Sequence, residues 1–273
     1  MVSDLARSHA FYQDILGFRP LERQGSTVVL SASGEAPAQI ILSTTDHVVP
    51  RPARTTGLYH VAIRLPDRRA LSRVFRRALE HRTPFHGAAD HLVSEALYLP
   101  DPDGNGLELY IDRPRQDWPK MDGQIAMSSD PLNLQDLLNE SENDKNLWDC
   151  IDPKTDIGHI HLQVSNLERA EAFYADLLGL DVTQRSYPGA IFLSAGGYHH
   201  HLGLNIWISR NAPPPPPDAV GMISFKLNIP DEGARLELLK RIQEKGHTIE
   251  AYSLTELVTG ALIKDPDGIQ IVL

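Results

Sequence analysis

Histidines gather at a few places in this chain where their type and spacing could support metal or proton chemistry. Two of the twelve, His159 and His161, stand in the segment GHIHL, and three more form a run at 199–201. His60 opens HVAIRLPD, and Glu108 lies within NGLELY. Neutral imidazoles and carboxylates bind divalent metals, and histidine also transfers protons near neutral pH. These residues therefore suggest a metal or acid–base site if the fold brings them together.

The elements that must position these residues belong to an internal repeat. VSDLARSHAFYQDILGF at 2–18 and VSNLERAEAFYADLLGL at 164–180 agree at ten of seventeen positions. The turn sequence DPDG occurs at 101–104 and again at 265–268, each time before an alternating apolar strand. Self-similarity of this kind indicates that one supersecondary unit has been copied along the chain.

A second repeated plan is a strand, a turn and an amphipathic helix, seen at 60–82 and again at 224–246. In the first copy the apolar spacing predicts one buried helix face, made of Leu71, Val74, Phe75 and Leu79. Together the repeats predict four modules of strand, helix and further strands, at 1–48, 57–113, 157–209 and 219–273. The first of these modules would lack its first strand.

Two domains follow from this arrangement. The first would span 1–113 and the second 157–273, and a polar, acidic connection would join them at 114–156, with a short helix in LNLQDLLNE. The length of 273 residues allows two domains of ordinary size, each with its own core.

Composition narrows the classes of function. A formal net charge of −10 argues against nucleic acid or an anionic membrane as the main partner. The sequence shows no apolar stretch of membrane-spanning length and no basic-then-apolar leader pattern, so we expect neither a membrane span nor an export signal. The single cysteine, Cys150, excludes an internal disulfide framework and suits a reducing compartment. The sequence thus predicts a cytoplasmic protein that acts on a small molecule.

The strings TGLYHVAI, HLVSEALYLPDPDGNGLELYIDRPR and GHIHLQVSNL carry a resemblance that covers nearly the whole chain. The sequence resembles the vicinal oxygen chelate superfamily of glyoxalases, bleomycin-resistance proteins and type I extradiol dioxygenases. Within it, the sequence is most similar to two-domain bacterial catechol 2,3-dioxygenases. The resemblance implies an α+β fold in which four βαβββ modules form two barrel-like domains of paired, curved mixed sheets.

In this family the metal ligands are a histidine on the first strand of each paired module and a glutamate on the last strand of one module. His60, Glu108 and His159 match these positions, whereas the fourth module has Ser224 and Val272 instead. A complete ligand set then requires module two to pair with module three, and module one with module four. Such a set favours non-haem Fe(II), with Mn(II) as the alternative that the same ligands serve.

The resemblance also implies catalytic roles for His200 and Tyr98. His200 would act as acid and base, with His199 or His201 in its place if the alignment is one residue out. Tyr98 would hydrogen-bond a substrate oxygen, and His161 could replace His159 as a ligand. The residues expected to line the same pocket are His91, His161, His199 and His201. The segment 198–207 is expected to be one strand, with His199 and His201 on one face.

The implied activity is extradiol cleavage of a small aromatic diol with O2, and a homo-oligomer is compatible with the sequence. One alternative is a metal-dependent isomerase or thiol transferase of the glyoxalase type, for which Asn205 would be the further ligand. Another is a non-catalytic binding protein of the bleomycin-resistance kind. A third is a truncated, inactive fragment, because module one begins in mid-motif. The sequence does not distinguish between individual catechols.

Overall fold

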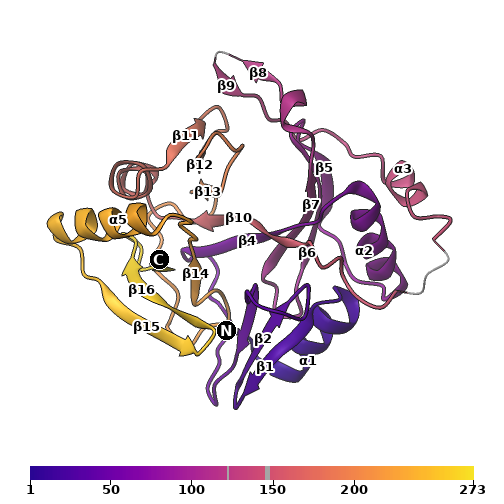
Figure 1. Ribbon diagram of the computed structural model, residues 1–273, viewed down its shortest axis with the longest axis horizontal. Helices are drawn as coiled ribbons and strands as arrows, with labels where there is room; N and C mark the ends of the chain where they lie inside the picture. Colours follow the sequence, from indigo (N-terminus) through magenta and orange to yellow (C-terminus); the bar gives the residue numbers. More distant parts are fainter. Residues whose placement is uncertain (122, 145–147) are drawn as a thin grey trace. The chain divides into compact units, whose positions relative to one another are not determined.

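The computed structural model describes residues 1–121, 123–144 and 148–273, which group into two compact units (Figure 1). The first unit comprises Met1–Val49 and Tyr59–His161, and the second comprises Pro50–Leu58 and Leu162–Leu273. Within the predicted connection at 114–156, residues 122 and 145–147 lie outside the described residues. The predicted domain boundaries stay a prediction.

The first unit begins with a helix and a three-stranded antiparallel sheet. Its elements are α1 (Leu5–Ala10), the π-helical turn η1 (Phe11–Ile15), β1 (Arg19–Gln24), β2 (Thr27–Ser31) and β3 (Ile40–Ser43). The side chain of Asp4 accepts a hydrogen bond from the amide of Arg7 and so caps α1 at its first turn. These residues match the helix and later strands predicted for module one.

The predicted βαβββ order is confirmed in the second module. Its elements are β4 (Gly57–Arg64), α2 (Arg68–Glu80), β5 (Gly87–Asp90), β6 (Ser94–Pro100) and β7 (Gly106–Asp112). Strands β4 and β7 are parallel, whereas β6 pairs antiparallel with both β7 and β5. Next to β4 on its other side lies β10 (Asp156–Gln163), so the order in this unit is β10-β4-β7-β6-β5.

The two faces of this sheet differ in chemistry because successive side chains of a strand alternate between faces. One face contributes Ile63, Leu97, Leu107, Leu109 and Ile111 to the core, which also contains Leu71, Val74 and Phe75 of α2. The predicted helix face is correct for these three residues and wrong for Leu79, which is 44% exposed. The fully buried Ala78, one residue earlier, lies on the inner side of this last turn.

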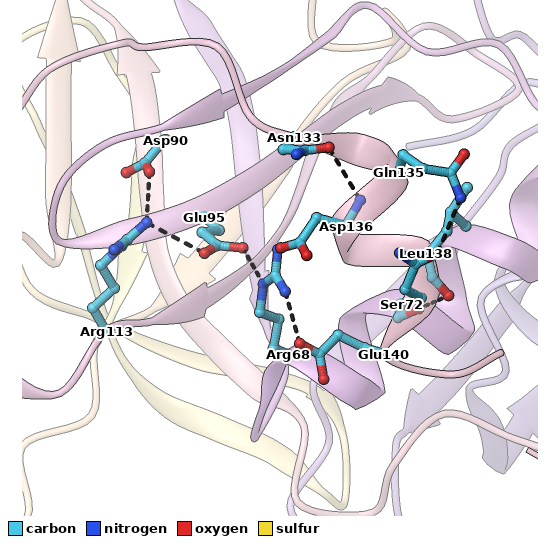
Figure 2. A network of polar contacts seen from close by, with 11 residues as sticks. Arg68, Ser72, Asp90, Glu95, Arg113, Asn133, Gln135, Asp136, Leu138 and Glu140 are labelled. Atoms are coloured by element: carbon cyan, nitrogen blue, oxygen red, sulfur yellow. Dashed lines mark hydrogen bonds and ion pairs between the residues drawn. The ribbon is translucent and has the colours of Figure 1, made fainter. Parts of the chain in front are cut away.

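The described residues of the connection after β7 contain four short elements. These are η2 (Arg115–Asp117), β8 (Lys120–Met121), β9 (Gln124–Ile125) and α3 (Leu134–Asn139), the last of which confirms the predicted short helix. Figure 2 shows how Arg68 of α2 holds this segment through ion pairs to Asp136 and Glu140, both at 2.7 Å, while it also pairs with Glu95 of β6 at 2.8 Å. Helix α3 is therefore tied to module two by charge complementarity as well as by the buried Leu137.

The second unit contains the rest of module three and module four. Module three continues with α4 (Leu167–Glu171), η3 (Ala172–Leu177), β11 (Asp181–Gln184), β12 (Ala190–Ser194) and β13 (Leu202–Asn205). Module four comprises β14 (Ser224–Lys226), α5 (Glu232–Glu244), β15 (Glu250–Thr255), β16 (Val258–Lys264) and β17 (Gln270–Val272), with the sheet order β14-β17-β16-β15. Strands β14 and β17 are parallel and the other pairs antiparallel, so the predicted α+β class with mixed sheets is confirmed.

One finding concerns membranes. Of the helices in the described parts of the chain, none combines the length and the apolar character that a bilayer span requires.

Candidate metal centre

Three predicted ligands converge within the first unit, each from a different strand. His60 lies on β4, Glu108 on β7 and His159 on β10. The Nε2 atoms of His60 and His159 are 2.9 and 3.2 Å from the same carboxylate oxygen, Oε2 of Glu108. One ligand atom from each residue lies within 4.8 Å of the others, and all three side chains are buried.

Strand register explains this convergence. In the parallel pair of β4 and β7, His60 is opposite Gly106 and Ala62 is opposite Glu108, so His60 and Glu108 lie on one face of the sheet. Because β10 neighbours β4, His159 reaches the same place from the other side. The first strands of modules two and three are thus neighbours, as the ligand set requires. The pairing of module one with module four stays a prediction.

Gly106 permits the close approach of β4 to β7. A Cβ atom added at this glycine would lie 2.1 Å from the carbonyl oxygen of Tyr59, the residue before His60. Any larger residue would therefore push apart the two strands that carry His60 and Glu108.

Burial and charge act in opposite directions on Glu108. Burial works to raise the pKa of its carboxyl group, but the charges and hydrogen bonds of His159 and His60 outweigh burial and hold the pKa well below its ordinary value. The carboxylate is therefore ionised at neutral pH. For His161, burial and then the charges of His60 and His159 lower the imidazole pKa well below its ordinary value, so this ring is neutral.

The donor set fits a divalent metal ion. Two imidazole nitrogens and one carboxylate oxygen, buried and facing one another, are the ligands of a facial site that leaves positions open for other molecules. His161 lies beside this cluster, with its ring centroid 4.9 Å from that of His60, but it is not a member. Among the histidine, cysteine, aspartate and glutamate side chains of the described residues, the cluster therefore consists of His60, Glu108 and His159.

Tyr98 and His91 form a directed hydrogen-bond chain at the edge of this cluster. Tyr98 pairs with Glu108 across β6 and β7, and its ring centroid is 5.6 Å from that of His60. The Nδ1 atom of His91 is 2.6 Å from the carbonyl oxygen of Ser128, which can only accept, so Nδ1 carries the hydrogen. In the neutral ring Nε2 then accepts from the Tyr98 hydroxyl, 2.7 Å away.

The histidines at 199–201 belong to the second unit, and their predicted role at the metal stays a prediction. The expected strand over 198–207 is wrong, because β13 covers only Leu202–Asn205 and the three histidines precede it. They contact one another instead: Nδ1 of His199 lies 2.8 Å from Nδ1 of His200, and His201 stacks on Tyr198. The expectation that two of them share a strand face therefore has no basis.

Two tyrosines near the cluster were missed by sequence reasoning. Tyr110 is fully buried with its ring centroid 4.9 Å from that of His159, and Tyr59 lies 5.0 Å from His161 by the same measure. Strand periodicity could have predicted Tyr110 near the cluster, because it lies two residues after Glu108 and so shares its strand face. Burial and the negative charge of Glu108 raise the pKa of Tyr59.

The chain matches the model of a known superfamily. The Glyoxalase/Bleomycin resistance protein/Dioxygenase superfamily model matches residues 1–109 and 156–273, and the chain belongs to this superfamily. It is also 40% identical over 269 residues to the catechol-2,3-dioxygenase of Bacillus subtilis (strain 168), an alignment that covers 96% of this chain and 93% of that protein.

Solved structures agree on the fold. A putative dioxygenase from Bacillus subtilis superposes with a TM-score of 0.60 at 11% identity, over 98% of this chain and 81% of that one. Glyoxalase I from Zea mays superposes with a TM-score of 0.55 at 17% identity, over 100% of this chain and 88% of that one. The predicted fold of paired, curved mixed sheets is thereby confirmed.

Proposed function

We propose that this protein is an extradiol ring-cleaving dioxygenase, which opens a catechol-type substrate with O2 at a non-haem Fe(II) centre. The observation that carries the proposal is the buried convergence of His60, Glu108 and His159. Two imidazoles and one carboxylate leave the coordination positions that a chelating diol and dioxygen need, and Mn(II) would accept the same ligands. The similarity to a catechol-2,3-dioxygenase over nearly the whole chain supports this reaction class.

A bound divalent iron would supply Lewis acidity toward the diol hydroxyls and a route for electrons from the ring to dioxygen. The residues of the chain would then manage protons. The hydroxyl of Tyr98 donates to His91, so its oxygen can accept a hydrogen bond from a substrate hydroxyl. If that proton moves to Tyr98, the tyrosine proton can pass to Nε2 of His91, whose Nδ1–H is held by the Ser128 carbonyl. His200 is the proposed acid–base partner from module three.

A glyoxalase-type isomerase or transferase is the second candidate. The family resemblance implies a further protein ligand for that chemistry, and among the histidine, cysteine, aspartate and glutamate side chains of the described residues the cluster has three members. Asn205, the candidate for a further ligand, accepts a hydrogen bond from the amide of Trp207 at 3.3 Å. The similarity to a catechol-2,3-dioxygenase over nearly the whole chain favours the dioxygenase over the isomerase. A non-catalytic binding protein would have no use for a buried, ionised glutamate between two imidazoles.

The test is anaerobic loading with Fe(II), followed by catechol and then air. We expect oxygen uptake together with growth of the visible absorbance of the ring-cleaved product. Ser224→Ala, which changes the position equivalent to His60 in module four, should behave like the wild type, and His60→Ala should show neither signal. Bound metal without oxygen uptake across several catechols would contradict the proposal. Turnover of a thiol adduct of an α-ketoaldehyde with Zn or Ni would then favour the isomerase.

A further inference from the structure

A second set of polar contacts joins the same three strands that carry the proposed metal ligands. Arg64 lies on β4, Asp112 on β7 and Asp156 on β10. Nε and Nη2 of Arg64 contact the two carboxylate oxygens of Asp156 at 2.9 and 2.6 Å, and Nη1 contacts Oδ2 of Asp112 at 3.2 Å. One guanidinium thus links all three strands, and the pair with Asp156 has the forked geometry that fixes orientation as well as distance.

On β4 and β7 the clasp lies at a regular distance from the ligands. Arg64 follows His60 by four residues and Asp112 follows Glu108 by four, so these two clasp residues share the face of the ligands at a spacing of about 13 Å along the strands. On β10, Asp156 is the first residue of the strand and lies three residues before His159. Tyr110 lies between Glu108 and Asp112 on β7. A Cβ atom added at Gly158 would be 1.8 Å from the Tyr110 hydroxyl and 3.2 Å from Cβ of Arg64. Arg64 and Tyr110 therefore contact β10 immediately before His159.

Strand β10 needs such a contact because no tight turn sets its register. The short connection at 101–105 joins β6 to β7, whereas β10 follows the long connection that begins at Arg113. A slip of one residue moves a strand by about 3.3 Å and turns each side chain to the opposite face. Such a slip would remove His159 from the cluster while leaving most backbone hydrogen bonds possible.

We propose that Arg64 is the positioning residue of the metal site. By clasping Asp156 and Asp112, it holds β10 in the register that places His159 opposite Glu108 and His60. The inference rests on the proposed function, since it assigns a role toward the metal that those ligands would hold. Arg64 is 35% exposed and Asp156 is 46% exposed, so the pairs themselves add little to the free energy of unfolding. The effect belongs to metal affinity.

The test is titration of the metal-free protein with Co(II), followed by the visible absorption of the bound ion, and thermal unfolding of the metal-free protein. We expect Arg64→Gln to weaken Co(II) binding roughly 10- to 100-fold and to change the Co(II) spectrum, as outer contacts of metal ligands do. Arg64→Lys, which keeps the charge but not the fork, should lie between Arg64→Gln and the wild type. Arg185→Gln is the matched control, because Arg185 makes a forked pair with Glu171 in the second unit. It should leave Co(II) affinity unchanged and shift the melting temperature as little as Arg64→Gln does.

Each outcome decides the matter. Wild-type affinity and spectrum in Arg64→Gln, or an equal loss of affinity in Arg185→Gln, would overturn the positioning role alone. If Arg64→Gln fails to fold, Asp156→Asn is tested for the same loss of Co(II) affinity. The Asp156 side chain is half-exposed, and asparagine keeps its size and shape. A wild-type protein that binds no Co(II) would overturn the proposed function, and this inference with it.

Discussion

Modules two and four of this chain share a folding plan but differ at the metal site. Both contain the DPDG turn, and in each case a tyrosine from an earlier helix reaches its first aspartate. Tyr12 donates to Asp101 at 3.3 Å, and Tyr174 donates to Asp265 at 3.0 Å. Both tyrosines lie in a π-helical turn, η1 or η3, so the repeat preserves an unusual helix geometry together with the contact that it serves.

The second aspartate of each turn is used in the same way. The amide and hydroxyl of Ser3 donate to Asp103, and those of Ser165 donate to Asp267. In each compact unit, this pair of contacts fastens the start of one module to the last turn of the next. Their recurrence identifies them as structural contacts, since they are present whether or not metal ligands are nearby.

The register of the first and last strands is also repeated. Ser224 is opposite Gln270 in module four, as His60 is opposite Gly106 in module two. Val272 therefore occupies the place of Glu108, and both ligand positions of module four hold residues that cannot bind iron. The comparison teaches that the fold does not require the ligands, so their presence in one copy points to function.

The largest expected effect is loss of metal binding when a ligand of module two is removed. Glu108→Ala removes the carboxylate that both imidazoles face and should weaken Fe(II) binding by more than roughly 100-fold, beyond the range of outer contacts. Ser224→Ala should bind the metal like the wild type. Metal content measured after anaerobic loading and desalting checks both. Normal content in Glu108→Ala would mean that the ion is held elsewhere.

Gly158→Ala should produce the next largest effect. The added Cβ would lie 1.8 Å from the hydroxyl oxygen of Tyr110, whose side chain is fully buried. We expect a loss of about 2–3 kcal/mol in the free energy of unfolding, measured by denaturant titration. Tyr110→Phe in the same chain should recover part of this loss. Gly87→Ala, where a Cβ would meet nothing within 4 Å, is the control and should stay near the wild type.

The pH dependence of stability at Asp265 extends the comparison of the two DPDG turns. Burial, as the largest cause, raises its pKa from 3.8 to about 6. Between these values the folded protein keeps a proton that the unfolded chain has lost, so this group contributes stability at low pH that disappears as pH rises through about 6. Asp265→Asn does not titrate and can keep the contacts with Tyr174 and the turn amides. Relative to the wild type, it should therefore gain about 2–3 kcal/mol between pH 4 and pH 7.

The control for this prediction lies in the other unit. Burial also raises the pKa of Asp101, so Asp101→Asn should change in the same direction. Chemical denaturation of each variant and the wild type at both pH values provides the measurement. A pH-independent difference between Asp265→Asn and the wild type would show that the buried carboxyl does not titrate in this range.

Tyr98→Phe should have the smallest effect of the four. It removes the hydroxyl that donates a hydrogen bond to His91 but leaves the three ligands in place. We expect about a tenfold loss of ring-cleavage rate, the effect of losing one hydrogen bond near the reacting atoms. Metal affinity should stay within twofold of the wild type. Loss of iron from this variant would assign Tyr98 to the metal site and not to proton handling.

Repeats made much of this structure predictable. Strand and helix order and the DPDG turns follow from aligning the modules with one another, whereas the choice of His60, Glu108 and His159 as ligands comes from the resemblance to the family. Repeat alignment succeeds here because each copy must satisfy the same packing and turn geometry. The differences between copies then indicate the pairing of modules two and three, because module four has Ser224 and Val272 at the ligand positions.

The contacts that the sequence did not predict depend on local backbone geometry or on distant neighbours. Gly196 and Gly197 both adopt positive φ angles and form a turn. Because β13 begins only at Leu202, the two-residue periodicity of a strand does not apply to His199–His201. The role of Arg64 depends on β10 lying next to β4, which no local pattern around Arg64 contains. The π-helical turns at Phe11–Ile15 and Ala172–Leu177 depart from the spacing of 3.6 residues on which helix patterns rest.

The most direct test of the account is a crystal structure of the Fe(II)-loaded protein, with anomalous scattering measured at the iron absorption edge. We predict one anomalous peak per chain, bonded to Nε2 of His60, Oε2 of Glu108 and Nε2 of His159. An iron peak at any other group of side chains, or none between these three in crystals that contain iron, would contradict it.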